Sequence, residues 1–238
     1  MSDIRAVLLD KDGTLVDFEA TWTSVARQMA LMAADGDPVR AEFLLEEAGL
    51  DPATNRFRPD SIFAAGSNAE VVELWHPQLD RAELAAAIKR FDAFSSSAGA
   101  ESAVMVAGVP EALARLHALD LILGVATNDS TAGAERTLRA LGVAALFAAA
   151  FGYDAVARPK PAPDMMHAFA DLTGLKPSQI AMVGDSRHDL ETGRAAGAGL
   201  VVGVLSGTGT REALEPLADL LIGSVAELPD LLRPRTAN

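Results

Sequence analysis

The second half of the chain alternates short apolar runs with amphipathic segments, and this alternation restricts the possible folds more than any other feature. The runs are short and rich in branched residues, as buried parallel strands are. We predict strands at residues 121–126, 148–151, 180–183, 199–204 and 220–222, and helices at residues 110–119, 131–141, 163–173, 189–196 and 225–232. Such alternation favours an α/β fold, a Rossmann-like parallel sheet with helices on both faces.

One more predicted strand, residues 4–9, is separated from this half by a long stretch with helical periodicity. Within that stretch we predict helices at residues 22–34, 39–48, 70–75 and 81–94, a loop at residues 50–68 and a linker at residues 95–99. We therefore expect residues 1–17 and 101–238 to form an α/β core, and residues 18–100 to form an inserted helical domain.

Composition excludes several classes of function. The chain of 238 residues has a formal net charge of −13, which argues against nucleic-acid binding, and no cysteine, which excludes disulfides, thiol nucleophiles and Cys-ligated metals. Its apolar runs are too short for a membrane span, and its start lacks the pattern of a signal peptide. We expect a cytoplasmic protein that binds neither nucleic acid nor membrane, and the oligomeric state stays open.

Polar side chains gather where three predicted strands end. Asp10 and Asp12 follow the first strand, Thr127-Asn128-Asp129 follows the strand at 121–126, and Asp185 follows the strand at 180–183, with Asp189 four residues later. Ligands of open α/β sheets bind beyond the carboxyl ends of the strands. These groups are expected to meet at one sheet edge, together with Lys160 from a proline-rich loop.

The expected cluster suits phosphoryl transfer. Asp10 and Asp185 supply the oxygen ligands that Mg²⁺ prefers, and a carboxylate can also attack phosphorus directly. Lys160 and the metal would neutralise the transferring group. Asp12 could protonate the leaving alkoxide and then activate water.

These residues resemble the four ordered motifs of the haloacid dehalogenase superfamily: Asp10-Lys-Asp12-Gly-Thr-Leu, Thr127, Lys160 and Gly-Asp185-Ser-Arg-His-Asp189. The helical insert lies where the family's type-1 cap is inserted, so the resemblance implies a catalytic core of residues 1–17 and 101–238 and a helical cap domain of residues 18–100. Residues 203–211 are similar to the phosphoglycolate-phosphatase-like branch.

The resemblance implies a phosphoric monoester hydrolase that forms an aspartyl-phosphate, with Asp10 as nucleophile and Asp12 as general acid and base. Thr127 would donate a hydrogen bond to the phosphoryl group, and Lys160 would anchor it. Mg²⁺ would be held by Asp10, the backbone carbonyl of Asp12 and Asp185, with Asp189 acting through water.

Some of these candidate residues could have a purely structural role instead of a role in catalysis or binding. Thr127 could close its strand, Asp189 could cap a helix, and the glycines of residues 199–209 could form ordinary turns. Asn128 and Arg58 are candidate substrate contacts, although Arg58 could equally be exposed to solvent.

We expect a small phosphorylated metabolite as substrate, for which phosphoglycolate is one candidate. Two other functions stay open: a phosphomutase of the β-phosphoglucomutase type, and a phosphate- or metal-binding regulatory protein without turnover.

Overall fold

The computed structural model describes residues 3–232 and contains a six-stranded sheet in the order β5-β4-β1-β6-β7-β8. The strands are β1 (Ala6–Leu9), β4 (Ile122–Ala126), β5 (Phe147–Phe151), β6 (Ile180–Gly184), β7 (Leu200–Val204) and β8 (Leu220–Ile222). Every neighbouring pair is parallel. The predicted parallel α/β sheet is confirmed.

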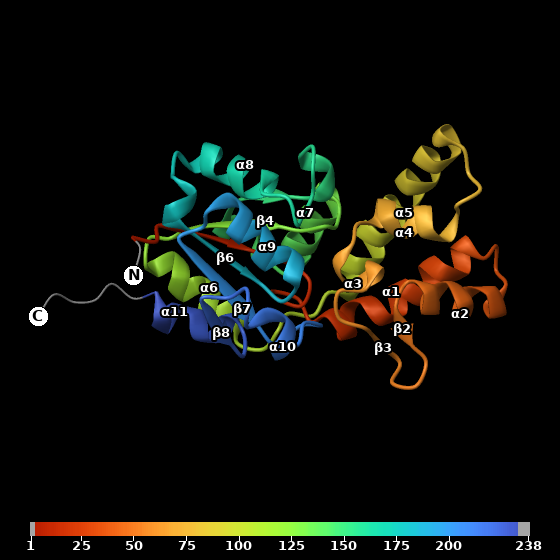
Figure 1. Cartoon of the computed structure of the whole chain (residues 1–238), viewed down its shortest axis with the longest axis horizontal. Helices are drawn as coiled ribbons and strands as arrows, with labels where there is room; N and C mark the ends of the chain where they lie inside the picture. The colour runs from red at the N-terminus through yellow and green to blue at the C-terminus, as the bar shows by residue number, and fades with distance from the viewer. Residues whose placement is uncertain (1–2, 233–238) are drawn as a thin grey trace, which may run out of the picture.

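Helices cover both faces of this sheet (Figure 1). They are α6 (Val109–Ala118), α7 (Thr131–Ala140), α8 (Asp164–Thr173), α9 (Arg187–Ala196), α10 (Arg211–Leu214) and α11 (Leu228–Leu231). Alternate residues of β1 point to opposite faces, so Val7 and Leu9 join one hydrophobic cluster while Ala6 and Leu8 join another. All four are fully buried, which places β1 at the centre of the core.

The segment between β1 and α6 lies at the other end of the molecule (Figure 1). It contains α1 (Phe18–Ala33), α2 (Pro38–Glu47), α3 (Ile62–Ala65), α4 (Asn68–Trp75) and α5 (Arg81–Ser102), with a two-stranded ribbon of β2 (Leu50–Asp51) and β3 (Arg56–Phe57). We call residues 18–102 the cap; they have a hydrophobic cluster of their own. The predicted domain boundary at residues 100 and 101 stays a prediction.

Two predictions within the cap are wrong. Residues 95–99 are not a linker but part of α5, and the expected loop at 50–68 contains β2, β3 and α3. The small residues of α5 suggested a linker, yet Ser95, Ser96 and Gly99 are buried. A Cβ on Gly99 would lie 2.9 Å from the indole ring of Trp22, so the small residue permits close packing of α5 against α1.

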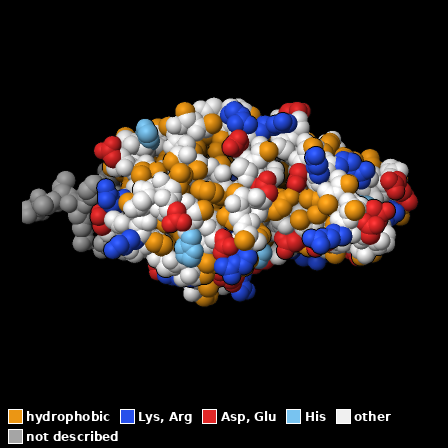
Figure 2. All heavy atoms as spheres, turned by 90° about the horizontal axis from the view of Figure 1, so that it is seen from above, with side chains coloured by type: hydrophobic (Ala, Val, Ile, Leu, Met, Phe, Trp, Pro, Cys, Tyr) orange, Lys and Arg blue, Asp and Glu red, His pale blue; other side chains and the backbone are white. Residues whose placement is uncertain are grey.

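Charged side chains of both signs are interspersed over the face seen in Figure 2. This face shows no continuous basic stripe of the kind that binds nucleic acid. Within residues 3–232, no helix combines the length and the apolar character needed to cross a bilayer.

Candidate active site

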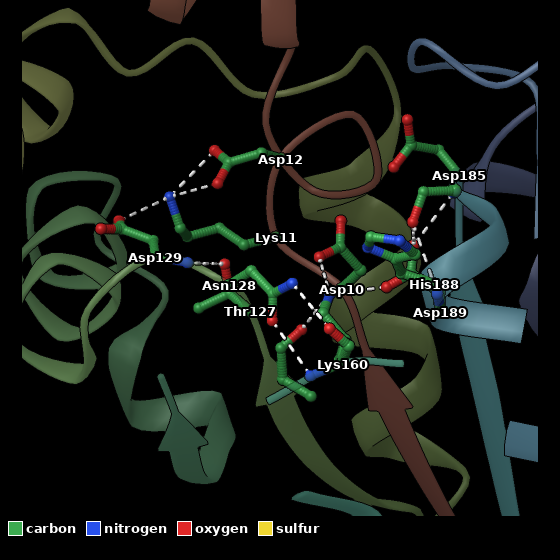
Figure 3. Close-up of polar contacts among 12 residues, drawn as sticks. Asp10, Lys11, Asp12, Thr127, Asn128, Asp129, Lys160, Asp185, His188 and Asp189 are labelled. Carbon is green, nitrogen blue, oxygen red and sulfur yellow. Dashed lines mark hydrogen bonds and ion pairs between the residues drawn. The ribbon is translucent and has the colours of Figure 1, made fainter. Parts of the chain in front are cut away.

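The sheet order brings the predicted site residues together. β4, β1 and β6 are adjacent, and Thr127, Asp10 and Asp185 directly follow them. Since the strands are parallel, their carboxyl ends share one edge, and the three side chains point into the same region in Figure 3. All three residues are buried.

Lys160 links two of the carboxylates. Its Nζ lies 2.6 Å from Oδ1 of Asp10 and 2.6 Å from Oδ1 of Asp189, and it donates to the Ala126 carbonyl at 3.0 Å. These contacts use all three of its donors. Burial alone would lower the pKa of Lys160, but Asp10 and Asp189 outweigh that effect and raise the pKa above its ordinary value. Lys160 is therefore a permanent cation beside Asp10.

Asp10, Asp185 and Asp189 each offer an oxygen atom within 4.8 Å of the others, and all three are buried. Burial, with the charge of Asp189 as the next cause, raises the pKa of Asp10 to about 7. Burial and the charges of Asp10 and Asp189 likewise raise the pKa of Asp185 well above its usual range. When ionised, the three carboxylates carry more negative charge than Lys160 balances, which is why these pKa values are raised. A divalent cation with oxygen ligands fits this donor set.

The loop after β7 encloses Asp185. The backbone N–H of Thr208 donates to Oδ2 of Asp185 at 2.7 Å, and a Cβ on Gly207 would lie 1.9 Å from the same oxygen. Gly13, at φ +89°, also lies against Asp185, and a Cβ there would lie 2.5 Å from Oδ2. The loop glycines, expected to form ordinary turns, therefore also fit tightly around this carboxylate.

Asp12 belongs to a second cluster. Nζ of Lys11 lies 2.9 Å from Oδ1 and 2.7 Å from Oδ2 of Asp12, and 3.1 Å from Oδ2 of Asp129 (Figure 3). From the cap, the indole of Trp22 donates to Oδ1 of Asp12 at 2.6 Å. The same ring lies beneath Nζ of Lys11, 5.0 Å from centroid to nitrogen. Two donors therefore hold the carboxylate of Asp12 in this position.

Burial, and then the charge of Asp12, raise the pKa of Asp129, although Lys11 acts in the opposite direction. The pKa of Lys11 itself is raised: burial alone would lower it, but the two carboxylates dominate.

Sequence reasoning placed Asp129 at this edge of the sheet but gave it no role in the site, and it missed Lys11 and this contact of Trp22. Local pattern gave no signal for Lys11, because alternation along an extended segment would point its side chain away from those of Asp10 and Asp12.

Asn128 connects the core with the cap. Its side-chain amide donates to the carbonyls of Ala65 at 2.8 Å and Lys160 at 3.0 Å, and its Oδ1 accepts from the Lys160 N–H at 3.1 Å. The Nδ1 atom of His188 also lies 3.1 Å from the Ala65 carbonyl. Asn128 thus fixes the Lys160 loop and the cap together, a role that sequence reasoning did not assign.

Thr127 and Asp189 have structural contacts as well. Oγ1 of Thr127 accepts from the Asp129 N–H at 3.1 Å. Oδ2 of Asp189 accepts from the N–H of Ser186 at 3.0 Å and from its hydroxyl at 2.7 Å, which caps α9. The predicted cap of α9 is formed by Ser186 and Asp189 together.

Arg58 lies apart from the other predicted site residues. It is exposed, and its guanidinium donates to the Leu50 carbonyl at 3.4 Å. It is not among the residues that line the cavity above the acidic cluster. Its predicted contact with substrate has no support in this arrangement of the cap.

A cavity of about 60 Å³ lies between core and cap. Its core side is lined by Asp10, Asp12, Thr127, Asn128, Asp129, Lys160, Asp185 and Ser186. Its cap side is lined by Phe18, Trp22, Phe63, Ala64, Ala65, Gly66, Ser67, Asn68 and Val71. The Tyr153 hydroxyl donates to Oδ2 of Asp92 at 2.6 Å, a further contact between core and cap. The cap therefore covers the acidic cluster in this structure.

Comparisons with known proteins agree with this geometry. The model of the haloacid dehalogenase-like hydrolases matches residues 4–197. The chain is 31% identical over 244 residues to a phosphoglycolate phosphatase of Shigella boydii, covering 99% of this chain and 96% of the relative. It is 30% identical to one of Escherichia coli K12, with the same coverage.

Among solved structures, a subfamily IA hydrolase of the same superfamily from Geobacter sulfurreducens is similar, with a TM-score of 0.65 and 25% identity. The similarity covers 98% of each chain. The shared architecture thus includes the cap as well as the sheet.

Proposed function

The chain belongs to the haloacid dehalogenase-like hydrolases, and from this premise we propose that it is a phosphoric monoester hydrolase. It would act on small phosphate monoesters through an aspartyl-phosphate, with Mg²⁺. The observation that carries this proposal is the buried constellation of Asp10, Lys160, Asp185 and Asp189 at the carboxyl edge of the sheet.

In the first step, an oxygen of Asp10 attacks phosphorus while the ester P–O bond breaks. Asp12 lies two residues along the same loop and gives its proton to the leaving alkoxide, which departs as an alcohol. In the second step, the Asp12 carboxylate takes a proton from water, which attacks the phosphoryl group. The Asp10 carboxylate and inorganic phosphate are released.

Asp10, the Asp12 carbonyl and Asp185 would hold Mg²⁺, with Asp189 acting through water. The ion would supply positive charge to the transferring phosphoryl oxygens. Lys160 keeps a positive charge at Asp10 throughout, and Thr127 would donate its hydroxyl proton to a phosphoryl oxygen. The cap would exclude bulk water, which strengthens these electrostatic interactions.

The experiment is phosphate release from a panel of small phosphate esters, with and without Mg²⁺. Phosphoglycolate belongs in the panel because it is the substrate in the relatives' names. We expect Mg²⁺-dependent release by the wild type and none by Asp10→Asn. Release that persists in Asp10→Asn would contradict the assignment of the nucleophile.

The same panel separates the alternatives. Conversion of a sugar phosphate to its isomer without phosphate release would favour a phosphomutase. Binding of esters with neither release nor isomerisation would favour a regulatory protein.

A further inference from the structure

The cap side of the active-site cavity is apolar or uncharged. Phe18, Trp22, Phe63 and Val71 provide its apolar surface. Among the described residues that line the cavity, the only cation is Lys160. The leaving group of a substrate would lie on this side, because the nucleophile and the acidic cluster occupy the other.

Neither buried cation near the cavity is available to a second anionic group of a substrate. Nζ of Lys160 already contacts Asp10, Asp189 and the Ala126 carbonyl. Nζ of Lys11 contacts the carboxylates of Asp12 and Asp129. Each ammonium group has three donors, so both are satisfied by groups of the protein.

The amino end of α4 also faces the cavity, through Ser67 and Asn68. A helix N-terminus favours anions, but here a carboxylate of the protein already occupies it. Oε2 of Glu70 accepts from the Ser67 N–H at 2.7 Å and from the Ser67 hydroxyl at 3.0 Å. A second anion would be repelled by Glu70.

Asn68 is engaged in a similar way. Its side-chain amide donates to Oδ1 of Asp92 at 2.9 Å and to Oγ of Ser95 at 2.8 Å. The carboxylates of Glu70 and Asp92 thus lie directly behind the lining residues Ser67 and Asn68, and Asp129 lines the cavity from the core. A second anion of the substrate would meet these carboxylates without a free cation, and a buried carboxylate without a partner is costly.

We propose that the substrate carries no anionic group other than its phosphoryl group. The leaving group would be a small neutral alcohol. Its carbon atoms would contact the aromatic rings of the cap, and its hydroxyls would donate to the side-chain oxygen of Ser67 or Asn68. This inference rests on the proposed phosphatase function and narrows it. It ranks phosphoglycolate, with its carboxylate next to the ester carbon, below neutral esters of the same size.

The test uses pairs of esters that differ only by a carboxylate in place of a hydroxymethyl group. Phosphoglycolate is paired with 2-hydroxyethyl phosphate, and 3-phosphoglycerate with glycerol 3-phosphate, all assayed with the wild-type chain and Mg²⁺. We expect kcat/KM of the neutral member of each pair to be higher by at least about tenfold. An equal or higher kcat/KM for phosphoglycolate would overturn the inference and leave the phosphatase assignment intact. If no ester releases phosphate, the proposed function itself fails.

A variant pair tests the electrostatic reason. Ala64 lines the cavity from α3 and is half-buried. Ala64→Lys adds a cation there, and Ala64→Met adds a side chain of similar length without charge. We expect Ala64→Lys to shift the preference toward phosphoglycolate by about tenfold relative to Ala64→Met. If both variants prefer phosphoglycolate over 2-hydroxyethyl phosphate to the same extent, the electrostatic explanation is contradicted. The class of substrate is decided independently, by the ester pairs assayed with the wild type.

Discussion

The indole nitrogen of Trp22 lies 2.6 Å from Oδ1 of Asp12, so a cap helix donates a hydrogen bond directly to the loop that follows β1. Nζ of Lys11 contacts the same carboxylate from the core. The position of the proposed general acid and base thus depends on the cap as well as on its own loop.

Trp22→Phe removes this donor and keeps an aromatic ring against Phe63. We expect kcat to fall roughly tenfold, less than the roughly 10²- to 10⁴-fold that a lost acid–base group costs. An aryl phosphate should be less affected, because its leaving group needs little protonation. Equal losses for alkyl and aryl esters would show that Trp22 does not act through Asp12.

Asp12→Asn keeps the shape of the side chain but cannot transfer the proton. We expect most turnover of alkyl phosphates to be lost, by roughly 10²- to 10⁴-fold, while the far-UV circular dichroism stays unchanged. Steady-state phosphate release measures the effect. Unchanged turnover would rule out the acid–base role.

Lys11 is 1% exposed and lies between two carboxylates. Lys11→Met leaves Asp12 and Asp129 without their cation, so we expect the free energy of unfolding to fall by about 3–5 kcal/mol. Urea unfolding measures the loss. The double variant Lys11→Met/Asp129→Asn should recover part of it, because one unpaired charge is removed. No recovery would mean that lost packing, rather than charge, causes the effect.

Gly207→Ala would place a Cβ 1.9 Å from Oδ2 of Asp185 and displace that carboxylate. We expect Mg²⁺ affinity to weaken by roughly 10- to 100-fold, measured from the Mg²⁺ dependence of phosphate release and of the melting temperature. Gly36→Ala is the control. Gly36 has φ +88° but no atom within 4 Å of the added Cβ, so that variant strains the backbone without touching the site. Equal Mg²⁺ affinities in both variants would contradict the role of this loop.

Asp10→Asn should change the pH dependence of stability in metal-free protein. Burial and then Asp189 raise the pKa of Asp10 from 3.8 to about 7. A carboxyl with a higher pKa in the fold stabilises the fold most below its unfolded pKa, and this contribution is lost as the pH rises through the folded pKa. Relative to wild type, Asp10→Asn should therefore gain stability as the pH rises from about 4 to about 7, the interval between the two pKa values, and keep this gain at higher pH. Thermal unfolding in EDTA measures it; a difference that does not vary with pH would contradict the raised pKa.

The sequence alone determined the sheet and the acidic part of the site. The alternation of apolar runs and amphipathic segments predicted the parallel sheet that is found. The polar residues at strand ends predicted the meeting of Asp10, Asp185 and Asp189 with Lys160, because the carboxyl ends of parallel strands share one edge. A local sequence pattern is enough to predict this part of the site, because the residues that follow adjacent parallel strands lie next to one another.

Only the tertiary structure decided the rest. Trp22 contacts Asp12, Lys11 joins Asp12 to Asp129, and Glu70 occupies the amino end of α4 beside the cavity. The small residues of α5 resembled a linker because periodicity does not show which surface a helix packs against. These features depend on how the cap packs against the core. That packing is set by complementary side chains on elements far apart in the sequence, which no local pattern records.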